Sequence, residues 1–342
     1  MTSIAALNVL LEKTSDWDKD ERYMATTDLC SALSRDIKID ENMEQRICAA
    51  VLKQLDDQSN DVQSVAVKCL AIITKKVQAQ QISDVCLKLC SLILEGKDAL
   101  RDVYAIGLKT LIADVPDSMG AMVTEQLTSK LLNGMGRTEA EDVQKECLDN
   151  MADLLQRFGH LNGPSHPDIM SCAVGQLQSE RRVVRKRAAH CLGALVVVSS
   201  DALLNSLVQV LLQRIESQQG EASSQGTRTL IQTIGTVSRT VGFRLGRHLE
   251  RIVPLFLTFC GDPADEAQQT EAANELRESC FPGLESFVLR CPREVAPFLD
   301  QILTTATQFL TYDPNYAVED AGSGEEEGGG MEQEQEEEEE FE

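Results

Sequence analysis

Residues 184–192, VRKRAAHCL, carry the pattern that decides the fold. In this pattern an apolar residue precedes an Arg, and small or apolar residues stand three and seven positions after the Arg. The pattern returns seven times, with Arg or Gln at the key position, at intervals of 38 to 49 residues. Its key positions are Arg22, Gln63, Arg101, Gln144, Arg185, Arg228 and Arg277.

Offsets of three and seven residues lie on one face of an α-helix, so each pattern predicts the buried stripe of one helix, here called helix B. An amphipathic segment before each pattern predicts a partner, helix A. Repeats of about 40 to 47 residues that consist of helix pairs are typical of HEAT and armadillo arrays. The sequence therefore predicts an all-α fold, a HEAT-repeat α-solenoid of about seven helix pairs over residues 1–316. The predicted A helices are residues 4–13, 43–55, 82–94, 119–132, 169–177, 203–215 and 249–259.

The C-terminal part departs from the regular array in three places. An eighth A-type segment, residues 298–310, has no B helix after it, so we expect one uncovered apolar side and an array that is cut short. Pro282 and Gly283 fall inside the seventh B helix, where Pro costs about 3 kcal/mol, so we expect this helix to break or to kink near Phe281. Residues 317–342 form a Gly- and Glu-rich acidic tail, for which we expect no fixed structure.

Charge and composition narrow the class of partner. The formal charge is −23, but 13 acidic residues and no Lys or Arg stand between 319 and 342, which leaves −10 for the rest of the chain. An acidic chain argues against nucleic acid and against anionic membranes as partners. No segment is long and apolar enough to predict a membrane span or a signal peptide. We therefore expect a protein partner.

The spacing of cysteines and histidines gives no reason to expect a redox site, a metal site or catalysis. The 11 cysteines occur without a C-x-x-C pair, which predicts buried reduced thiols in a cytoplasmic or nuclear protein. The four histidines do not have metal-ligand spacing, and no nucleotide-binding or hydrolase motif is present. The sequence thus predicts no enzyme, no cofactor, no metal and no small-molecule substrate.

Candidate binding residues come from the B pattern itself. The residues one and two positions after the key Arg or Gln should point away from the buried stripe, which predicts that Tyr23, Lys186 and Arg187 are exposed and bind a protein partner. At Val65 and Val103 we favour contact with the adjacent repeat. The recurring Arg residues could bind an acidic partner, but we expect them to bond a neighbouring repeat's loop carboxylate, because recurring residues usually serve the repeat.

Several stretches resemble one family in particular, the cullin-associated, neddylation-dissociated proteins. They include LLEKTSDWDKDERYMATTDL (10–29), LRDVYAIGLKTL (100–111), GFRLGRHLERIVPLFLTFC (242–260) and LTYDPNY (310–316). The resemblance is to the N-terminal repeats of that family. It implies a superhelix that binds a cullin and its RING subunit when the cullin lacks its ubiquitin-like modifier, and that regulates ligase assembly.

Two further expectations follow from the resemblance. Family members continue for many repeats after the acidic segment, so we expect this chain alone not to displace a substrate adaptor. The repeat period by itself suits an alternative equally well, a HEAT-type transport or phosphatase scaffold unrelated to ubiquitin. Only the quoted stretches discriminate between the two.

Overall fold

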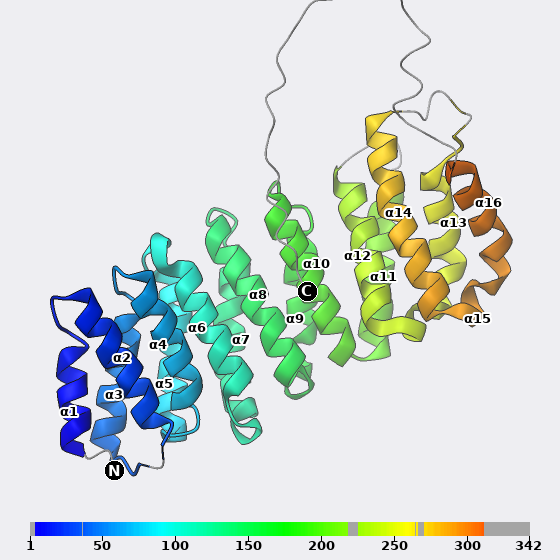
Figure 1. Cartoon of the computed structure of the whole chain (residues 1–342). Helices are drawn as coiled ribbons and strands as arrows, with labels where there is room; N and C mark the ends of the chain where they lie inside the picture. Colours follow the sequence, from blue (N-terminus) through cyan, green and yellow to red (C-terminus); the bar gives the residue numbers. More distant parts are fainter. Residues whose placement is uncertain (1–3, 36, 218–224, 264, 266–269, 311–342) are drawn as a thin grey trace, which may run out of the picture.

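The computed structural model describes residues 4–35, 37–217, 225–263, 265 and 270–310, and within these ranges its regular elements are all helices (Figure 1). The A helices are α1 (Ile4–Lys13), α3 (Glu41–Gln54), α5 (Ala79–Glu95), α7 (Gly120–Met135), α9 (His166–Gln176), α11 (Asp201–Ser217) and α13 (Leu249–Cys260). The B helices are α2 (Lys19–Leu33), α4 (Asn60–Ile73), α6 (Arg101–Asp114), α8 (Glu141–Phe158), α10 (Arg182–Val198), α12 (Gln225–Val241) and α14 (Glu271–Arg290).

The helix pairs stack in chain order, from α1 at one end to α16 (Leu299–Leu310) at the other (Figure 1). Each B helix packs against the B helix before and after it, whereas neighbouring A helices touch less. In a curved stack the more closely packed layer is the inner side, so the B helices form the inner layer of the solenoid. The predicted HEAT-type array of seven pairs is confirmed.

The core is a continuous band between the two layers, filled mainly by Leu, Ile, Val, Ala and Cys. Every residue three or seven positions after a key Arg or Gln is buried, as the helical period requires. Large aromatic side chains are few, and the fully buried ones are Tyr104, Phe158, Phe256 and Phe287. Because the core is not gathered around one centre, the stability of each repeat comes mainly from its contacts with the two neighbouring repeats.

Helix α14 passes through Pro282 and Gly283 without interruption, so of the two expected outcomes the break is wrong and the kink near Phe281 stays a prediction. Gly283 explains part of this continuity. A Cβ at position 283 would collide with the ring of Phe256 on α13, so only Gly lets the two helices approach this closely. Packing of α13 on α14 therefore offsets the cost of the Pro. Pro254 likewise lies inside α13.

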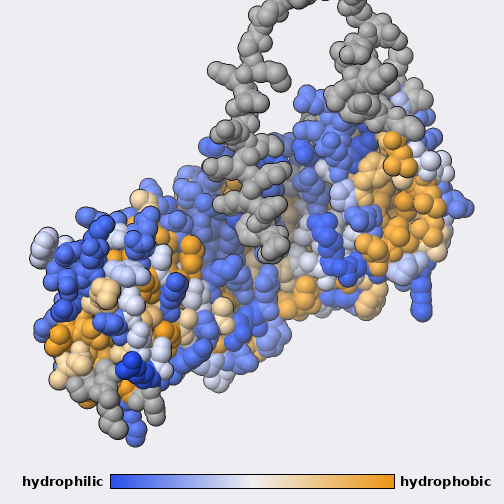
Figure 2. All heavy atoms as spheres, in the orientation of Figure 1, coloured by the Kyte–Doolittle hydropathy of each residue, from blue (hydrophilic) through white to orange (hydrophobic). Residues whose placement is uncertain are grey.

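Within the part of the chain that the structure describes, the C-terminal helix α16 is covered on one side only, as predicted. Ile302 is buried, and the Phe309 ring packs edge-on against Phe281 with ring centroids 5.9 Å apart. Leu303 and Leu310 are 62% and 83% exposed. Hydrophobic residues gather over this last part of the array (Figure 2). The YDPNY element, the boundary at 316 and the acidic tail lie outside the described residues.

All 11 cysteines are free thiols; Cys30 and Cys172 are half-buried and the others are buried. Burial raises the pKa of Cys86 to about 12, so this thiol is protonated at neutral pH. Among the described residues no helix has the length and apolar character needed to cross a membrane.

Candidate functional site

The recurring Arg at the start of the first B helix serves the repeat. Nε and Nη2 of Arg22 donate to the two carboxylate oxygens of Asp57, at 2.6 and 2.9 Å, and Asp57 lies in the turn of the next repeat. Nη1 of Arg22 also donates to the carbonyl oxygens of Asp16 and Trp17. The Arg22 guanidinium thus links the turn between helices A and B of its own repeat to the same turn of the next repeat. A bond to a loop carboxylate of the neighbouring repeat is the role that the sequence predicts for this position.

The other key residues fix the turn between helices A and B mainly through main-chain carbonyl groups. Nε of Arg101 donates to the carbonyl oxygen of Ile93 at 2.8 Å. Nη1 of Arg185 donates to those of Ser179 and Glu180, both at 2.8 Å. Most of these positions are therefore structural. Gln63, Gln144 and Arg277 likewise donate to the carbonyl oxygens of Asp57, Met135 and Cys260.

The start of α10 has an unusual distribution of charge. Arg182, Arg185, Lys186 and Arg187 occupy its first two turns, and its first turn contains no acidic residue. Among the other B helices, α2, α4, α6, α8 and α14 have acidic residues in the first turn, and α12 has none. The N-terminus of a helix is the positive end of its dipole, where a cation costs roughly 0.3–1 kcal/mol. Helix stability therefore does not account for this basic cluster.

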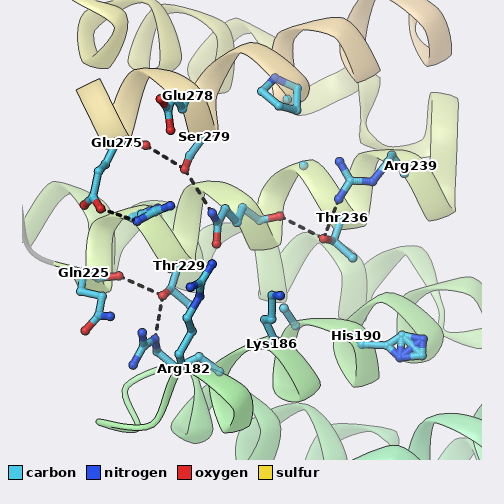
Figure 3. A pocket seen from close by; sticks show the side chains of 17 residues that line it. Arg182, Lys186, His190, Gln225, Thr229, Thr236, Arg239, Glu275, Glu278 and Ser279 are labelled. Atoms are coloured by element: carbon cyan, nitrogen blue, oxygen red, sulfur yellow. Dashed lines mark hydrogen bonds and ion pairs between the residues drawn. The ribbon is translucent and has the colours of Figure 1, made fainter. Parts of the chain in front are cut away.

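The basic cluster opens onto a groove of about 810 Å³ that crosses α10, α12 and α14, here called the basic groove (Figure 3). Small residues on successive B helices, Ala189, Gly235 and Gly283, lie along it. At Gly235 the helices come so close that an added Cβ would lie 3.6 Å from the Cα of Gly283. Small residues therefore make the hollow, and long polar side chains surround it.

Among the described residues that line the basic groove, cations outnumber carboxylates. The cations that line it are Arg182, Arg185, Lys186, Arg228 and Arg239, and the carboxylates are Glu275 and Glu278. Arg228 is paired with Glu275 at 2.9 Å. Within the described ranges no carboxylate lies in ion-pair range of Arg182, Lys186 or Arg239. An anionic ligand would therefore supply a missing partner.

The electrostatics of Arg185 reflect this excess of positive charge. Burial, and then the nearby cations Arg182 and Arg228, lower the pKa of the Arg185 guanidinium. An Arg remains charged at neutral pH even so. Burial is the main cause of the lowered pKa and repulsion from the two neighbouring cations adds to it, so a bound carboxylate would relieve that repulsion.

Lys186 and Arg187 are adjacent in the sequence but have different surroundings. Lys186 is exposed, as predicted, and its side chain lines the basic groove (Figure 3). Arg187 is only half-exposed, and its Nε lies 3.1 Å from Oδ2 of Asp149 on α8. The predicted exposure of Arg187 is therefore wrong, because a carboxylate on the preceding B helix draws its side chain towards that helix.

A line of ion pairs continues from Arg187 towards the N-terminal repeats. Lys109 on α6 lies 3.5 Å from Asp153 on α8, one helical turn after Asp149. Burial raises the pKa of both Asp149 and Asp153, despite the neighbouring cations. Charges on α6 and α8 are thus paired across the inner layer, whereas those of the basic groove are largely unpaired.

Tyr23 is exposed, as predicted, and lies on α2, four B helices before α10. With packed helices about 8–10 Å apart, it lies some 30–40 Å from Lys186 along the stack. The two residues share a layer but do not form one site. Val65 and Val103 are half-buried, and Val103 packs against the core, which agrees with contact between repeats.

Trp17, which is not among the predicted binding residues, is 90% exposed in the turn before α2. Its carbonyl oxygen accepts a hydrogen bond from Arg22, and the N–H of Asp18 bonds to Asp16 within the same turn. The turn is thus fixed while the indole faces solvent. Aromatic side chains held in this way are frequent binding anchors. A signal existed, since this is the only Trp of the chain and stands between two Asp residues.

Curated relatives match most of this chain. It is 37% identical to cullin-associated NEDD8-dissociated protein 2 of Mus musculus over 91% of its own length and 25% of that protein. It is 37% identical to cullin-associated NEDD8-dissociated protein 1 of Arabidopsis thaliana over 87% of its length and 24% of that protein. The chain therefore spans about a quarter of the length of these relatives.

A shorter relative matches three quarters of the chain. The N-terminal part of cullin-associated NEDD8-dissociated protein 1 of Emericella nidulans is 28% identical over 75% of this chain and 84% of its own length. No protein-family model matches.

Solved structures of karyopherins share the fold. Kap95p, solved with RanGDP, superposes with a TM-score of 0.64 at 11% identity, over 93% of this chain and 42% of that one. Kap121p, solved alone, gives a TM-score of 0.63 at 12% identity, over 90% of this chain and 32% of that one.

Proposed function

Because the chain is a homologue of the cullin-associated, NEDD8-dissociated protein family, we propose that it is a non-catalytic scaffold that binds cullin–RING ubiquitin ligases through its helical repeats. The observation that carries the proposal is the 37% identity over 91% of the chain to a relative whose name associates it with cullins. The ligand form we propose is the complex whose cullin lacks NEDD8. Binding of this form would influence ligase assembly.

The inner layer of B helices supports binding of a large partner. It displays Tyr23 in the first repeat and cations in the fifth, including Lys186, and the exposed Trp17 stands in the turn just before the first B helix. Buried aromatic and basic side chains supply much of the binding energy in protein interfaces. The spacing of some 30–40 Å between them suits a partner that lies along the array.

The alternative of a transport or phosphatase scaffold has weaker support. The karyopherin structures are only 11–12% identical to this chain, and such a likeness extends to the fold alone. The curated relatives, at three times that identity, point to cullins instead. The free thiols agree with a cytoplasmic or nuclear location, where thiols stay reduced.

Two substitutions on exposed residues of the B helices test whether this layer binds the partner. We expect Tyr23→Ala and Lys186→Glu each to weaken binding to a purified cullin–RING complex lacking NEDD8 by about 5- to 30-fold, the effect of losing roughly 1–2 kcal/mol at an interface. Isothermal titration calorimetry at fixed salt measures the affinity.

The matched control is Lys88→Glu, which reverses an exposed cation on the A helix α5 and should leave the affinity unchanged. An equal loss in the control would place the partner elsewhere on the array. Absence of binding by the unaltered chain would refute the function itself.

A further inference from the structure

The basic groove and the C-terminal acidic sequence of this chain have opposite charges. Of the described residues, five cations and two carboxylates line the groove, whereas residues 319–342 contain 13 acidic residues and no Lys or Arg. We propose that residues 325–342 bind in the basic groove of the same molecule, as an internal acidic ligand that an acidic partner segment must displace. This proposal does not depend on the identity of the partner.

Chain length allows the contact. Helix α16 ends at Leu310, and 14 residues separate it from Glu325. An extended chain of that length spans up to about 46–50 Å. Helix α16 packs on α13 and α13 packs on α14, which lines the groove, so two helix spacings of about 8–10 Å separate the end of α16 from the groove. The acidic residues therefore reach the groove without a second molecule.

The shape and donors of the groove suit carboxylates on an extended chain. Arg182 and Lys186 on α10 and Arg239 on α12 lie along a hollow left by small residues, with Arg182 and Arg239 towards opposite ends of it (Figure 3). Nη2 of Arg239 donates to Oγ1 of Thr236 at 3.0 Å, and the remaining guanidinium donors match the bidentate geometry of a Glu carboxylate.

Attachment to the same chain compensates for the weakness of each contact. Exposed ion pairs contribute little individually. A short flexible connection, however, gives an effective concentration in the millimolar range, so a few such pairs suffice for occupancy. Screening at 1 M salt, where the Debye length is about 3 Å, should release the segment.

Carbodiimide cross-linking of the full chain tests the proposal, because this reagent joins a Lys amine to a carboxylate in contact with it. Lys186 is the only lysine of the groove lining. In an equimolar mixture of 14N- and 15N-labelled chains at low salt, mass spectrometry should find Lys186 joined to glutamates of residues 325–342, with one isotope in each linked pair. Mixed isotopes would show that a second copy supplies the segment, and no link to Lys186 would overturn the proposal.

A matched pair of variants separates the groove from general charge. Arg182→Glu with Arg239→Glu retains Lys186 and should abolish the cross-link. Lys53→Glu with Lys88→Glu makes the same change of charge on the A helices α3 and α5 and should retain it. Circular dichroism establishes that both variants are folded. Equal cross-linking in the two would also overturn the proposal.

Competition provides an independent measurement. A fluorescent deca-glutamate peptide should bind the full chain at least tenfold more tightly when all 13 acidic residues of 319–342 are replaced by their amides. The replacement leaves the groove unchanged and removes its internal competitor. Equal affinity before and after replacement would mean that the acidic segment does not occupy the groove, whether or not the groove accepts acidic partners.

Discussion

At the scale of single residues, the key Arg positions show how a repeat sequence fixes both its own turn and its neighbour. The pair formed by Arg22 and Asp57 is the clearest case, because the two side chains are only 16% and 7% exposed. Loss of the guanidinium leaves a mostly buried carboxylate without its partner. Hydrogen bonds to charged groups contribute about 1.5–3 kcal/mol each.

We therefore expect Arg22→Ala to destabilise the first two repeats by about 2 kcal/mol. That value corresponds to roughly 30-fold faster amide hydrogen exchange in α2 and α3, with no change in α10. Lys13→Ala is the control. Both side chains of the Lys13–Glu21 pair are half-exposed, so its loss should leave hydrogen exchange in α2 and α3 unchanged. Faster exchange throughout the array would contradict the local role.

The same pair carries a pH dependence. Burial acts to raise the pKa of Asp57, but hydrogen bonds from Arg22 and from the N–H of Ser59 outweigh it, so the pKa lies below its ordinary 3.8. Because the folded-state pKa is depressed, the stabilisation is complete above about pH 5 and disappears as pH falls through that lower pKa. The difference in exchange between the unaltered chain and Arg22→Ala should accordingly shrink below pH 4.

At the scale of elements, the positions of the helices follow closely from the sequence, and their exceptions have physical causes. The predicted segment 4–13 coincides with α1, and 249–259 ends one residue before α13 does. At Pro282 the expected break does not occur, because helix propensity reports on an isolated helix and does not include the close approach of Gly283 to Phe256; the alternative kink stays a prediction. The prediction for Arg187 was wrong for a similar reason. Helical periodicity predicts which side of its helix a residue faces, but it does not reveal that Asp149 on the neighbouring helix lies close enough to bind the side chain.

The tight contact between α13 and α14 predicts opposite effects for two Gly-to-Ala changes. At Gly283 the added methyl group collides with Phe256, and overpacking of this kind costs about 1–3 kcal/mol. At Gly235 the same methyl group meets Arg239 Nη1 at 3.5 Å, an ordinary contact, while Ala favours the helix by about 1 kcal/mol.

Hydrogen exchange in α12 and α14 measures both effects. Gly283→Ala should lower the free energy of opening of α14, and Gly235→Ala should leave that of α12 unchanged or raise it. Similar losses in the two variants would mean that the close approach at Gly283 does not govern the packing of α13 on α14.

At the scale of the whole molecule, the array combines a structural repeat with an uneven distribution of charge. Periodicity predicts that the B helices share a layer, and it places Lys186 on the exposed side of α10. It cannot predict the basic groove, because the groove depends on small residues of three repeats meeting in space, at Ala189, Gly235 and Gly283. Trp17 lies in a turn, which the helical period does not describe.

Our central proposal is that this array binds the form of a cullin–RING ligase that lacks NEDD8. The most direct test immobilises the full chain and compares retention of two otherwise identical cullin–RING complexes, one with and one without NEDD8 on the cullin. We expect the immobilised chain to retain the complex without NEDD8 and to retain the modified complex at least tenfold more weakly. Equal retention of the two complexes would contradict the proposal.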